Sequence, residues 1–131
     1  MYNKIIYVAG PLTPRSDNQN HAIEYLTNVK RMLGIGQWLI NKGFAPYIPG
    51  MDFPLFLFGD APSEGCIKGM SMAFLRASAA VLVVGDYSKS GGTQAEIEEA
   101  KALGIPVFKS RGELMSWEEK RNEPIVEQVP A

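Results

Sequence analysis

The sequence contains very few of the residues that build disulfides and metal sites. Among its 131 residues there is one cysteine, Cys66, and one histidine, His21. A single cysteine excludes an internal disulfide and is typical of proteins in a reducing compartment. One cysteine and one histidine are too few for a zinc site with the usual ligands. We therefore expect no metal, and nothing in the sequence predicts a cofactor.

Long apolar runs and a charge excess of one sign are missing as well. The apolar run in the opening MYNKIIYVAG is far shorter than the roughly 20 residues of a membrane-spanning helix, and no signal-peptide pattern follows it. Thirteen Lys and Arg residues against fourteen Asp and Glu residues give a formal net charge of −1. Binding to nucleic acid polymers or anionic membranes needs a basic excess, so we expect neither partner and predict a soluble, cytoplasmic protein.

Length and composition indicate one globular domain. Hydrophobic residues make up 46% of the chain and charged residues 21%. A chain of this length buries roughly two-thirds of its unfolded surface, which suffices for a core without covalent cross-links. We therefore predict a single domain over residues 1–131.

Short apolar runs alternate along the chain with segments of helical periodicity. The runs are rich in β-branched residues, and we predict strands over 4–10, 44–49, 79–87 and 105–109. Helices are predicted over 19–41, from 62 or 63 to 77, over 93–103 and over 113–121. In the first helix the apolar positions at helical spacing are Ile23, Leu26, Val29, Leu33, Trp38 and Leu39. The alternation predicts an α/β fold, a Rossmann-like (flavodoxin-like) three-layer sandwich with a mostly parallel sheet.

Two loops are candidates for a binding site. In parallel sheets, ligands bind beyond the carboxyl ends of the strands, at a switch in strand order, which selects residues 10–20 and 85–93. The second loop continues into a helix and reads GDYSKSGGTQAEIEEA from Gly85. Its hydroxyls and unhindered N–H groups precede a helix whose dipole favours negative charge, as in an anion cradle. The residues of this cradle are Ser88, Ser90, Gly91, Gly92 and Thr93.

A purely structural interpretation explains the same segment. Thr93 and Glu96 have the spacing of a capping box, in which a glutamate at the third helical position reaches back to the cap N–H. Two glycines before a helix can form a tight strand-to-helix turn, and Asp86 can bond to turn amides. The residues alone leave both interpretations open.

The segment resembles the signature of the nucleoside 2-deoxyribosyltransferase-like superfamily, in particular its small, largely uncharacterised members. In that signature a serine, a glycine two residues later and a glutamate six residues after the serine follow a central strand. Ser90, Gly92 and Glu96 supply this pattern after AAVLVVGD. The opening IIYVAGPLT and the later GIPVF are also similar to family segments, so the resemblance extends over residues 4–109.

The resemblance implies N-glycosidic chemistry on a nucleoside or nucleotide. Glu96 stands where the family's nucleophile stands and would attack C1′ of the sugar to form a covalent glycosyl-enzyme. Another base or water would then take the sugar. Ser88 or Ser90, with the amides of Gly91 and Gly92, would hold a 5′-hydroxyl or 5′-phosphate. The other residues expected at the substrate are Tyr7, Gly10, Pro11, Asp86 and Thr93.

One position departs from the family pattern and keeps two other hypotheses open. Many members carry an aspartate in the helix before the central strand, where this chain has Ser71, and serine cannot act as an acid at neutral pH. Asp52, Asp60 or Asp86 could replace it only within hydrogen-bond reach of the base. One alternative is a non-catalytic nucleotide-binding or sensing module. The other is a nucleoside monophosphate phosphoribohydrolase-like enzyme, because the segment SGGTQAE of this chain partly matches the signature of those enzymes.

An oligomer is the last expectation. The apolar segment FPLFLF, residues 53–58, is unusual for a loop and is better explained as a subunit contact than as the wall of a base pocket. Enzymes of the resembled superfamily are commonly dimers or larger. We therefore expect a homo-oligomer.

Overall fold

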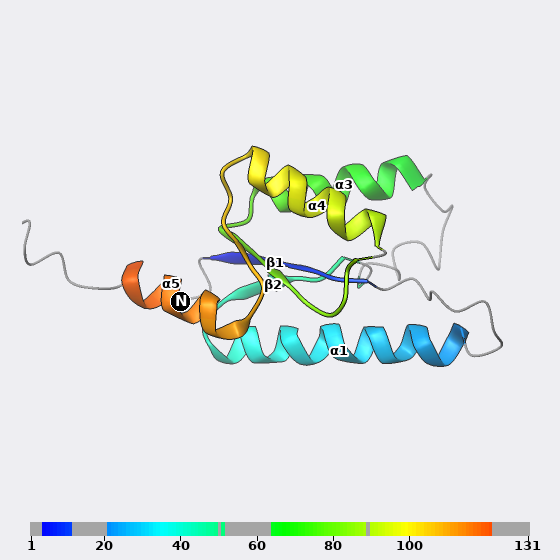
Figure 1. Ribbon diagram of the computed structural model, residues 1–131, viewed down its shortest axis with the longest axis horizontal. Coiled ribbons are helices and arrows are strands. Elements are labelled where there is room, and N and C mark those ends of the chain that lie inside the picture. Colours follow the sequence, from blue (N-terminus) through cyan, green and yellow to red (C-terminus); the bar gives the residue numbers. More distant parts are fainter. Residues whose placement is uncertain (1–3, 12–20, 50, 52–63, 89, 122–131) are drawn as a thin grey trace, which may run out of the picture.

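The computed structural model of the chain describes residues 4–11, 21–49, 51, 64–88 and 90–121 (Figure 1). Its strands are β1 (Ile5–Ala9), β2 (Ala45–Tyr47), β3 (Ala80–Val83) and β4 (Val107–Phe108). Its helices are α1 (His21–Asn41), α3 (Glu64–Arg76), α4 (Gly91–Ala102) and α5 (Arg111–Arg121). Within the described ranges, strands and helices alternate as the sequence predicts, which confirms the α/β class.

The four strands form one sheet with the order β2-β1-β3-β4, and every neighbouring pair is parallel. β1 and β3 lie in the centre, where Tyr7 is aligned with Val81. Every residue of β3 is buried, as expected for a strand covered on both faces. From β1 the chain moves outward to β2 and then crosses back to β3. The switch in strand order therefore lies between the carboxyl ends of β1 and β3, where open parallel sheets bind ligands.

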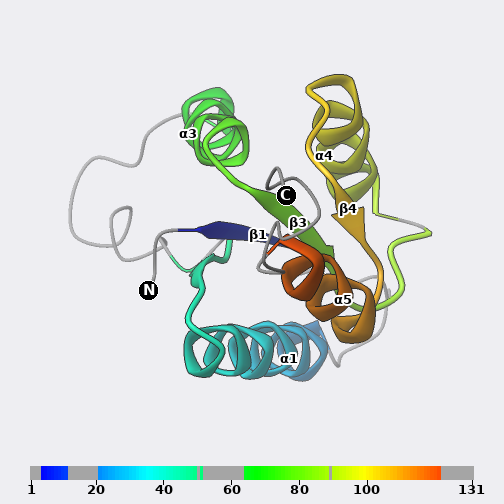
Figure 2. The ribbon, with the colours of Figure 1, turned by 90° about the vertical axis from the view of Figure 1, so that its left-hand side faces the viewer.

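Helices cover both faces of the sheet and complete the predicted three-layer sandwich. α1 and α5 lie on one face, and α3 and α4 lie on the other (Figure 2). Met32 from α1 and Leu114 from α5 pack against Ile6 and Leu82 in one core. The second core joins strand side chains to α3 and α4, and its buried members are Tyr7, Ala9, Leu75, Val81, Val83, Ile97 and Ala100.

The core-facing side of α1 matches the apolar positions selected in the sequence only in part. Leu39 is buried and Trp38 packs against the core, as expected. Ile23, Leu26 and Leu33 are 66%, 63% and 44% exposed. The side chains that α1 buries are Asn28, Met32, Ile35 and Leu39. Gly36 also faces inward, because a Cβ at that position would lie 2.6 Å from Cδ1 of Ile48. The sequence pattern fails at Ile23, Leu26 and Leu33 because the buried side of α1 includes a polar residue and a glycine, whereas its solvent side carries apolar ones.

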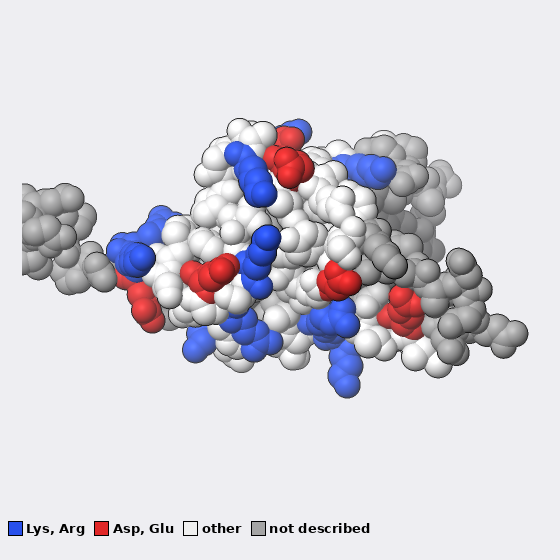
Figure 3. Space-filling view, viewed as in Figure 1, with Lys and Arg blue, Asp and Glu red and all other residues white. Residues whose placement is uncertain are grey.

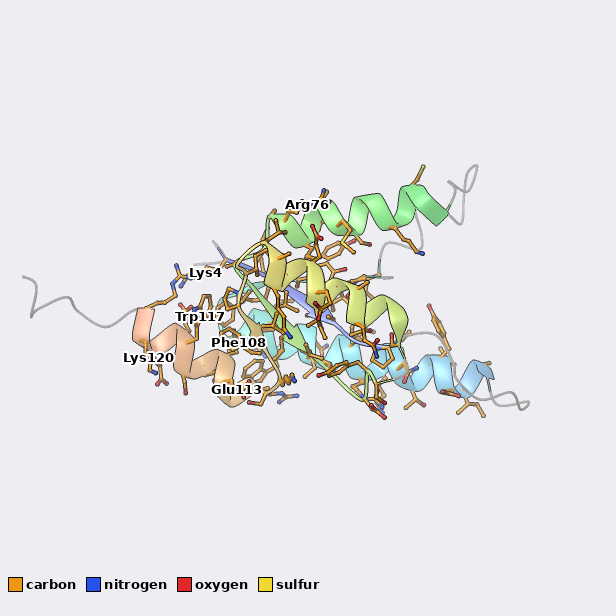
Figure 4. The ribbon with its side chains drawn as sticks, turned by 45° about the horizontal axis from the view of Figure 1, so that its top comes forward. Lys4, Arg76, Phe108, Glu113, Trp117 and Lys120 are labelled. Atoms are coloured by element: carbon orange, nitrogen blue, oxygen red, sulfur yellow. The ribbon has the colours of Figure 1, made fainter. Side chains whose placement is uncertain are left out.

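α5 closes the end of the sheet at which the strands begin. The rings of Phe108 and Trp117 pack with centroids 5.4 Å apart, and Lys4 forms an ion pair with Glu118 (Figure 4). On the face drawn in Figure 3, basic and acidic side chains of the described residues are interspersed. No helix in the described ranges is both long and apolar enough to cross a bilayer. The segment 53–58, with Asp52, Asp60 and the tail after residue 121, lies outside the described residues.

Candidate functional site

Hydrogen bonds hold the described residues between β3 and α4, which are 84–88 and 90. Gly85 has φ +76°, a backbone conformation that side-chain-bearing residues rarely adopt. The carboxylate of Asp86 accepts a hydrogen bond from the backbone N–H of Ser88 at 3.0 Å. The side-chain amide of Gln94 donates to the carbonyl oxygens of Tyr87 and Ser88, at 3.2 and 2.7 Å. These bonds define the path along which the chain enters α4.

Ser90 is the N-cap of α4, which corrects the predicted capping box. Its Oγ accepts a hydrogen bond from the backbone N–H of Thr93 at 3.3 Å and lies 2.8 Å from Oγ1 of Thr93. The helix begins at Gly91, so Glu96 is its sixth residue, one turn too far along to reach the cap N–H. Thr93 is the third helical residue instead. Glu96 is therefore free of the structural role that the sequence left open for it.

The side chain of Glu96 is partly buried and lies beside Tyr7. Burial raises the pKa of the Glu96 carboxyl to about 7, and the interaction with the Tyr7 hydroxyl opposes this rise. Burial also raises the pKa of Tyr7 well above its ordinary value, with the charge of Glu96 adding to the rise and Ser71 opposing it. At neutral pH the pair therefore consists of a phenol beside a carboxyl group that is close to half ionised.

The Tyr7 hydroxyl is buried without a conventional hydrogen bond to any described residue. Its contact with Glu96 is therefore looser than an ordinary hydrogen bond. The ring is held by Tyr47, with centroids 5.5 Å apart, and Tyr47 stacks in turn on Phe74 at 4.2 Å. An unsatisfied buried hydroxyl costs on the order of 1–3 kcal/mol. Such a group in a native fold needs an explanation, and a role at a binding site is one.

A cavity of about 280 Å³ opens beside this pair, between α3 and α4. Both helices begin at the end of the molecule where β1 and β3 finish (Figure 1). The lining residues are Lys68, Ser71 and Met72 of α3, and Gly91, Gly92, Ala95 and Glu96 of α4. A Cβ at Gly91 or Gly92 would meet nothing within 4 Å, so the backbone of the first turn of α4 is open on this side. The arrangement places a carboxyl group one helical turn from N–H groups that favour an anion.

A second cavity, of about 390 Å³, lies on the α1 side of the sheet. Its lining residues are Pro11, Glu24, Thr27, Asn28, Arg31 and Asp86. Pro11 and Asp86, which the sequence grouped with Glu96, thus line a different cavity from it. Gly10 lies between the two strand ends, where a Cβ would come within 2.6 Å of the carbonyl oxygen of Val84. Gly10 therefore has a packing reason to be glycine, whatever its role at a ligand.

The structure brings only some of the predicted site residues together. Those brought together on the α3 and α4 side are Tyr7, Gly91, Gly92 and Glu96, with Ser71 opposite them. Ser90 and Thr93 bond to each other at the cap, and Ser88 lies in the exposed loop. Sequence reasoning missed Lys68, although it precedes Ser71 by three residues on the same helix, the spacing at which helical side chains share a face. No group of three or more metal-ligating side chains occurs in the part of the chain described.

Solved structures of two transferases share this fold. A 2-deoxyribosyltransferase from the psychrotolerant bacterium Bacillus psychrosaccharolyticus superposes with a TM-score of 0.58 at 18% identity, over 79% of this chain and 69% of that one. A 2-deoxyribosyltransferase from Leishmania mexicana gives a TM-score of 0.53 at 21% identity, over 79% of this chain and 61% of that one. These likenesses confirm the flavodoxin-like fold and the predicted resemblance at the level of the fold.

Sequence comparison gives a family without an assigned activity. The model of DUF7768, a domain of unknown function, matches residues 4–110. No curated protein matches the sequence. The matched range contains β1, both cavities and α4, so every described residue of the candidate site lies inside it.

Proposed function

The chain belongs to the DUF7768 family, and we propose that it cleaves, or transfers the sugar from, the N-glycosidic bond of a nucleoside or nucleotide, with Glu96 as nucleophile. One observation carries the proposal. Glu96 is a partly buried carboxyl group that has no capping role, lines a cavity of about 280 Å³ and lies beside a buried phenol. The fold shared with two 2-deoxyribosyltransferases supports this reading.

The reaction would proceed by two displacements at one carbon. The ionised carboxylate of Glu96 attacks C1′, and the electron pair of the C1′–N bond leaves with the base, which gives a glycosyl ester. In the second step, water or the nitrogen of another base attacks C1′ from the opposite face and releases the carboxylate. The proton lost by the attacking group balances the proton taken up by the departing base. The configuration at C1′ is retained.

Tyr7 would act as a positioning residue. Its phenol stays protonated across the physiological range, because burial and the charge of Glu96 both raise its pKa. A phenol beside a carboxylate donates toward one oxygen and leaves the other for C1′. This interaction also favours the ionised form of Glu96, which is the nucleophilic form.

A non-catalytic nucleotide-binding module is the second candidate, and one observation favours it. Among the described residues that line the cavity, Glu96 is the single carboxylic acid, and Ser71 faces it from α3. Asp86 lines the other cavity and is not among the described residues that line this one. The described lining therefore offers no second carboxylic acid to protonate the leaving base.

Release of free base distinguishes the two candidates. The wild type, Glu96→Ala and Glu96→Gln are incubated with deoxynucleosides, ribonucleosides and their 5′-monophosphates, and bases are separated by chromatography. Release by the wild type alone supports the glycosidic reaction and identifies the substrate. If no base appears while a nucleotide raises the melting temperature, the binding module is the better conclusion. If no base is released and no nucleotide raises the melting temperature, both candidates are contradicted.

We also propose a homo-oligomer, for which α1 offers an apolar surface. Ile23, Leu26, Leu33 and Ile40 are each at least 44% exposed along one helix. Exposed apolar side chains gathered on one element are typical of subunit contacts. Sedimentation equilibrium of the wild type and of Leu33→Glu tests this: a wild type that is monomeric at micromolar concentration contradicts the proposal.

A further inference from the structure

We infer that the Glu96 cavity takes a substrate with a 5′-phosphate, a nucleoside 5′-monophosphate in preference to a free nucleoside, and that Lys68 supplies the charge that selects it. The inference rests on the proposed function and narrows it to one substrate class. It starts from a residue that the sequence pattern does not mark. Lys68 of α3 lines the same cavity as the first turn of α4.

Positive charge reaches this cavity from two helices. Gly91 and Gly92 expose the first turn of α4, where unpaired N–H groups and the helix dipole favour an anion. Lys68 adds a full positive charge from α3, on the opposite side of the same cavity. An ammonium group attracts phosphate as a point charge. A neutral 5′-hydroxyl gains little from this arrangement, whereas a phosphate dianion interacts with both sources.

The spacing between this cradle and the nucleophile suits a nucleotide. Gly92 and Glu96 both line the cavity and are four residues apart on α4. At 1.5 Å per residue, the rise between them is about 6 Å along the helix axis. The furanose ring and its 5′-methylene group span a similar length between the phosphate and C1′. A phosphate at the first turn therefore brings C1′ toward the carboxyl group one turn further along.

The Tyr7 hydroxyl places an unsatisfied polar group directly behind the cavity lining. Tyr7 is 0% exposed, and its hydroxyl has no conventional hydrogen bond to the described residues. It interacts with Glu96 and Ser71, which both line the cavity. A buried polar group left in this state is satisfied when a polar ligand group, or the carboxylate that the ligand orders, approaches it.

Lys68 also solves an electrostatic problem that a nucleotide creates. A phosphate held one turn from Glu96 places two anionic groups close together, and each disfavours the ionised form of the other. A cation in the same cavity offsets this repulsion. Lys68 is therefore expected to favour both binding of the phosphate and ionisation of the nucleophile while the nucleotide is bound.

The test compares matched substrates on matched variants. We would measure kcat/KM for the four 2′-deoxynucleoside 5′-monophosphates and the corresponding deoxynucleosides, with wild type, Lys68→Met, Lys68→Arg and Lys101→Met. Lys101 is exposed in the last turn of α4, outside the cavity, so its variant removes the same charge as a control. We expect the wild type to prefer the monophosphate by at least about tenfold, and Lys68→Met to lose about tenfold of that preference, mainly through KM. Lys68→Arg should retain most of the preference, and Lys101→Met all of it.

A binding arm separates failure of this inference from failure of the proposed function. Titration calorimetry on Glu96→Gln, alone and combined with Lys68→Met, measures Kd for the same ligands without turnover. Turnover without phosphate preference, or a preference that Lys68→Met leaves intact, overturns the inference while the proposed function stands. If no base is released but the monophosphate binds in a Lys68-dependent manner, the glycosidic reaction fails and the phosphate site is supported. Equal or absent binding of both ligand classes overturns the phosphate site.

Discussion

The buried hydroxyl of Tyr7 and the carboxyl group of Glu96 lie together on one side of the sheet, and each alters the protonation of the other. Tyr7 comes from the central strand β1, and Glu96 from the second turn of α4. The contact exists because β1 and β3 are neighbours and α4 follows β3 directly. A strand at the centre of the sheet is among the most rigid positions in the fold. β1 therefore holds the Tyr7 hydroxyl in a constant position beside the group that we propose as nucleophile.

Activity is expected to rise with pH through about 7. Only the ionised carboxylate of Glu96 attacks C1′, and burial raises the pKa of this group to about 7. Below that pH the nucleophile is protonated, and kcat/KM should fall about tenfold for each pH unit. The measurement is kcat/KM for base release between pH 5 and 9. If kcat/KM did not fall below pH 7, the assignment of Glu96 as the group that must be ionised would be contradicted.

Replacement of Tyr7 by phenylalanine should move the rise of kcat/KM to higher pH. The Tyr7 hydroxyl lowers the pKa of Glu96, so its loss favours the protonated carboxyl. We expect Tyr7→Phe to reduce kcat/KM about ten- to a hundredfold at pH 6 to 7 and less at pH 9. Tyr47→Phe is the matched control, since it also removes a phenolic hydroxyl from the aromatic stack. An equal loss at every pH would mean that Tyr7 acts on structure alone.

Glu96→Gln is expected to stabilise the fold at alkaline pH. The pKa of Glu96 is about 7 in the folded chain, against an ordinary value of 4.5. Between these values the folded state holds a proton that the unfolded state has lost, so stability falls as pH rises from about 4.5 to 7. Glutamine removes this dependence and should raise the free energy of unfolding at pH 8 by on the order of 2–3 kcal/mol.

Urea unfolding of both proteins at pH 4.5 and pH 8 measures the difference. At pH 4.5 most of the advantage of glutamine should be absent, because the carboxyl group is protonated in the folded chain. A variant that is less stable than the wild type at pH 8 would show that the charge of Glu96 is well compensated in the fold.

Several parts of the fold follow from local sequence signals. The buried run around Tyr7 predicts β1, and the run before Gly85 predicts β3, because strands covered on both faces need continuous apolar residues. α1 ends as predicted at residue 41, and Gly43, with φ 88°, has the conformation that is common just after a helix end. The family resemblance selected Glu96 and Gly92, which the structure brings to one cavity.

Other features depend on tertiary packing that no local pattern encodes. The solvent side of α1 carries Leu26 and Leu33, whereas its buried side includes Asn28, so hydrophobic periodicity was wrong at these two leucines although it was right at Leu39. Asp86 is five residues from Gly91 in sequence but lines a cavity on the other face of the sheet. Lys68 joins the site only because α3 packs beside α4. These relationships depend on the order of the strands and on the layer in which each helix packs. The spacing of residues along one helix does not determine either.

Loss of the N-cap should weaken α4 measurably. The Ser90 hydroxyl accepts the N–H of Thr93 and bonds to its side chain. Ser90→Ala is expected to lower the free energy of unfolding by about 1 kcal/mol, the usual cost of removing such a cap. Ser88→Ala changes the same residue type in the exposed part of the loop and should cost less than about 0.5 kcal/mol. Equal effects in thermal unfolding would contradict the assignment of Ser90 as the cap.

Two glycines should respond to alanine in opposite directions. A Cβ at Gly10 would lie 2.6 Å from the carbonyl oxygen of Val84 and 3.0 Å from the sulfur of Met32, so strand ends must separate to admit it. We expect Gly10→Ala to cost about 1–3 kcal/mol. Gly34 lies within α1, where a Cβ meets nothing within 4 Å, so alanine should stabilise the chain by about 0.5–1 kcal/mol.

Denaturant unfolding of the two variants, read together with base release, separates packing from substrate contact at Gly10. If Gly10 is glycine only because β1 and β3 approach closely, Gly10→Ala loses stability while kcat/KM of the remaining folded protein stays near that of the wild type. If the backbone of Gly10 also borders the sugar or the base, kcat/KM falls in the folded fraction as well, because a methyl group then occupies space that the substrate needs. Gly34→Ala, which lies away from both cavities, fixes the level of activity expected from a change in stability alone.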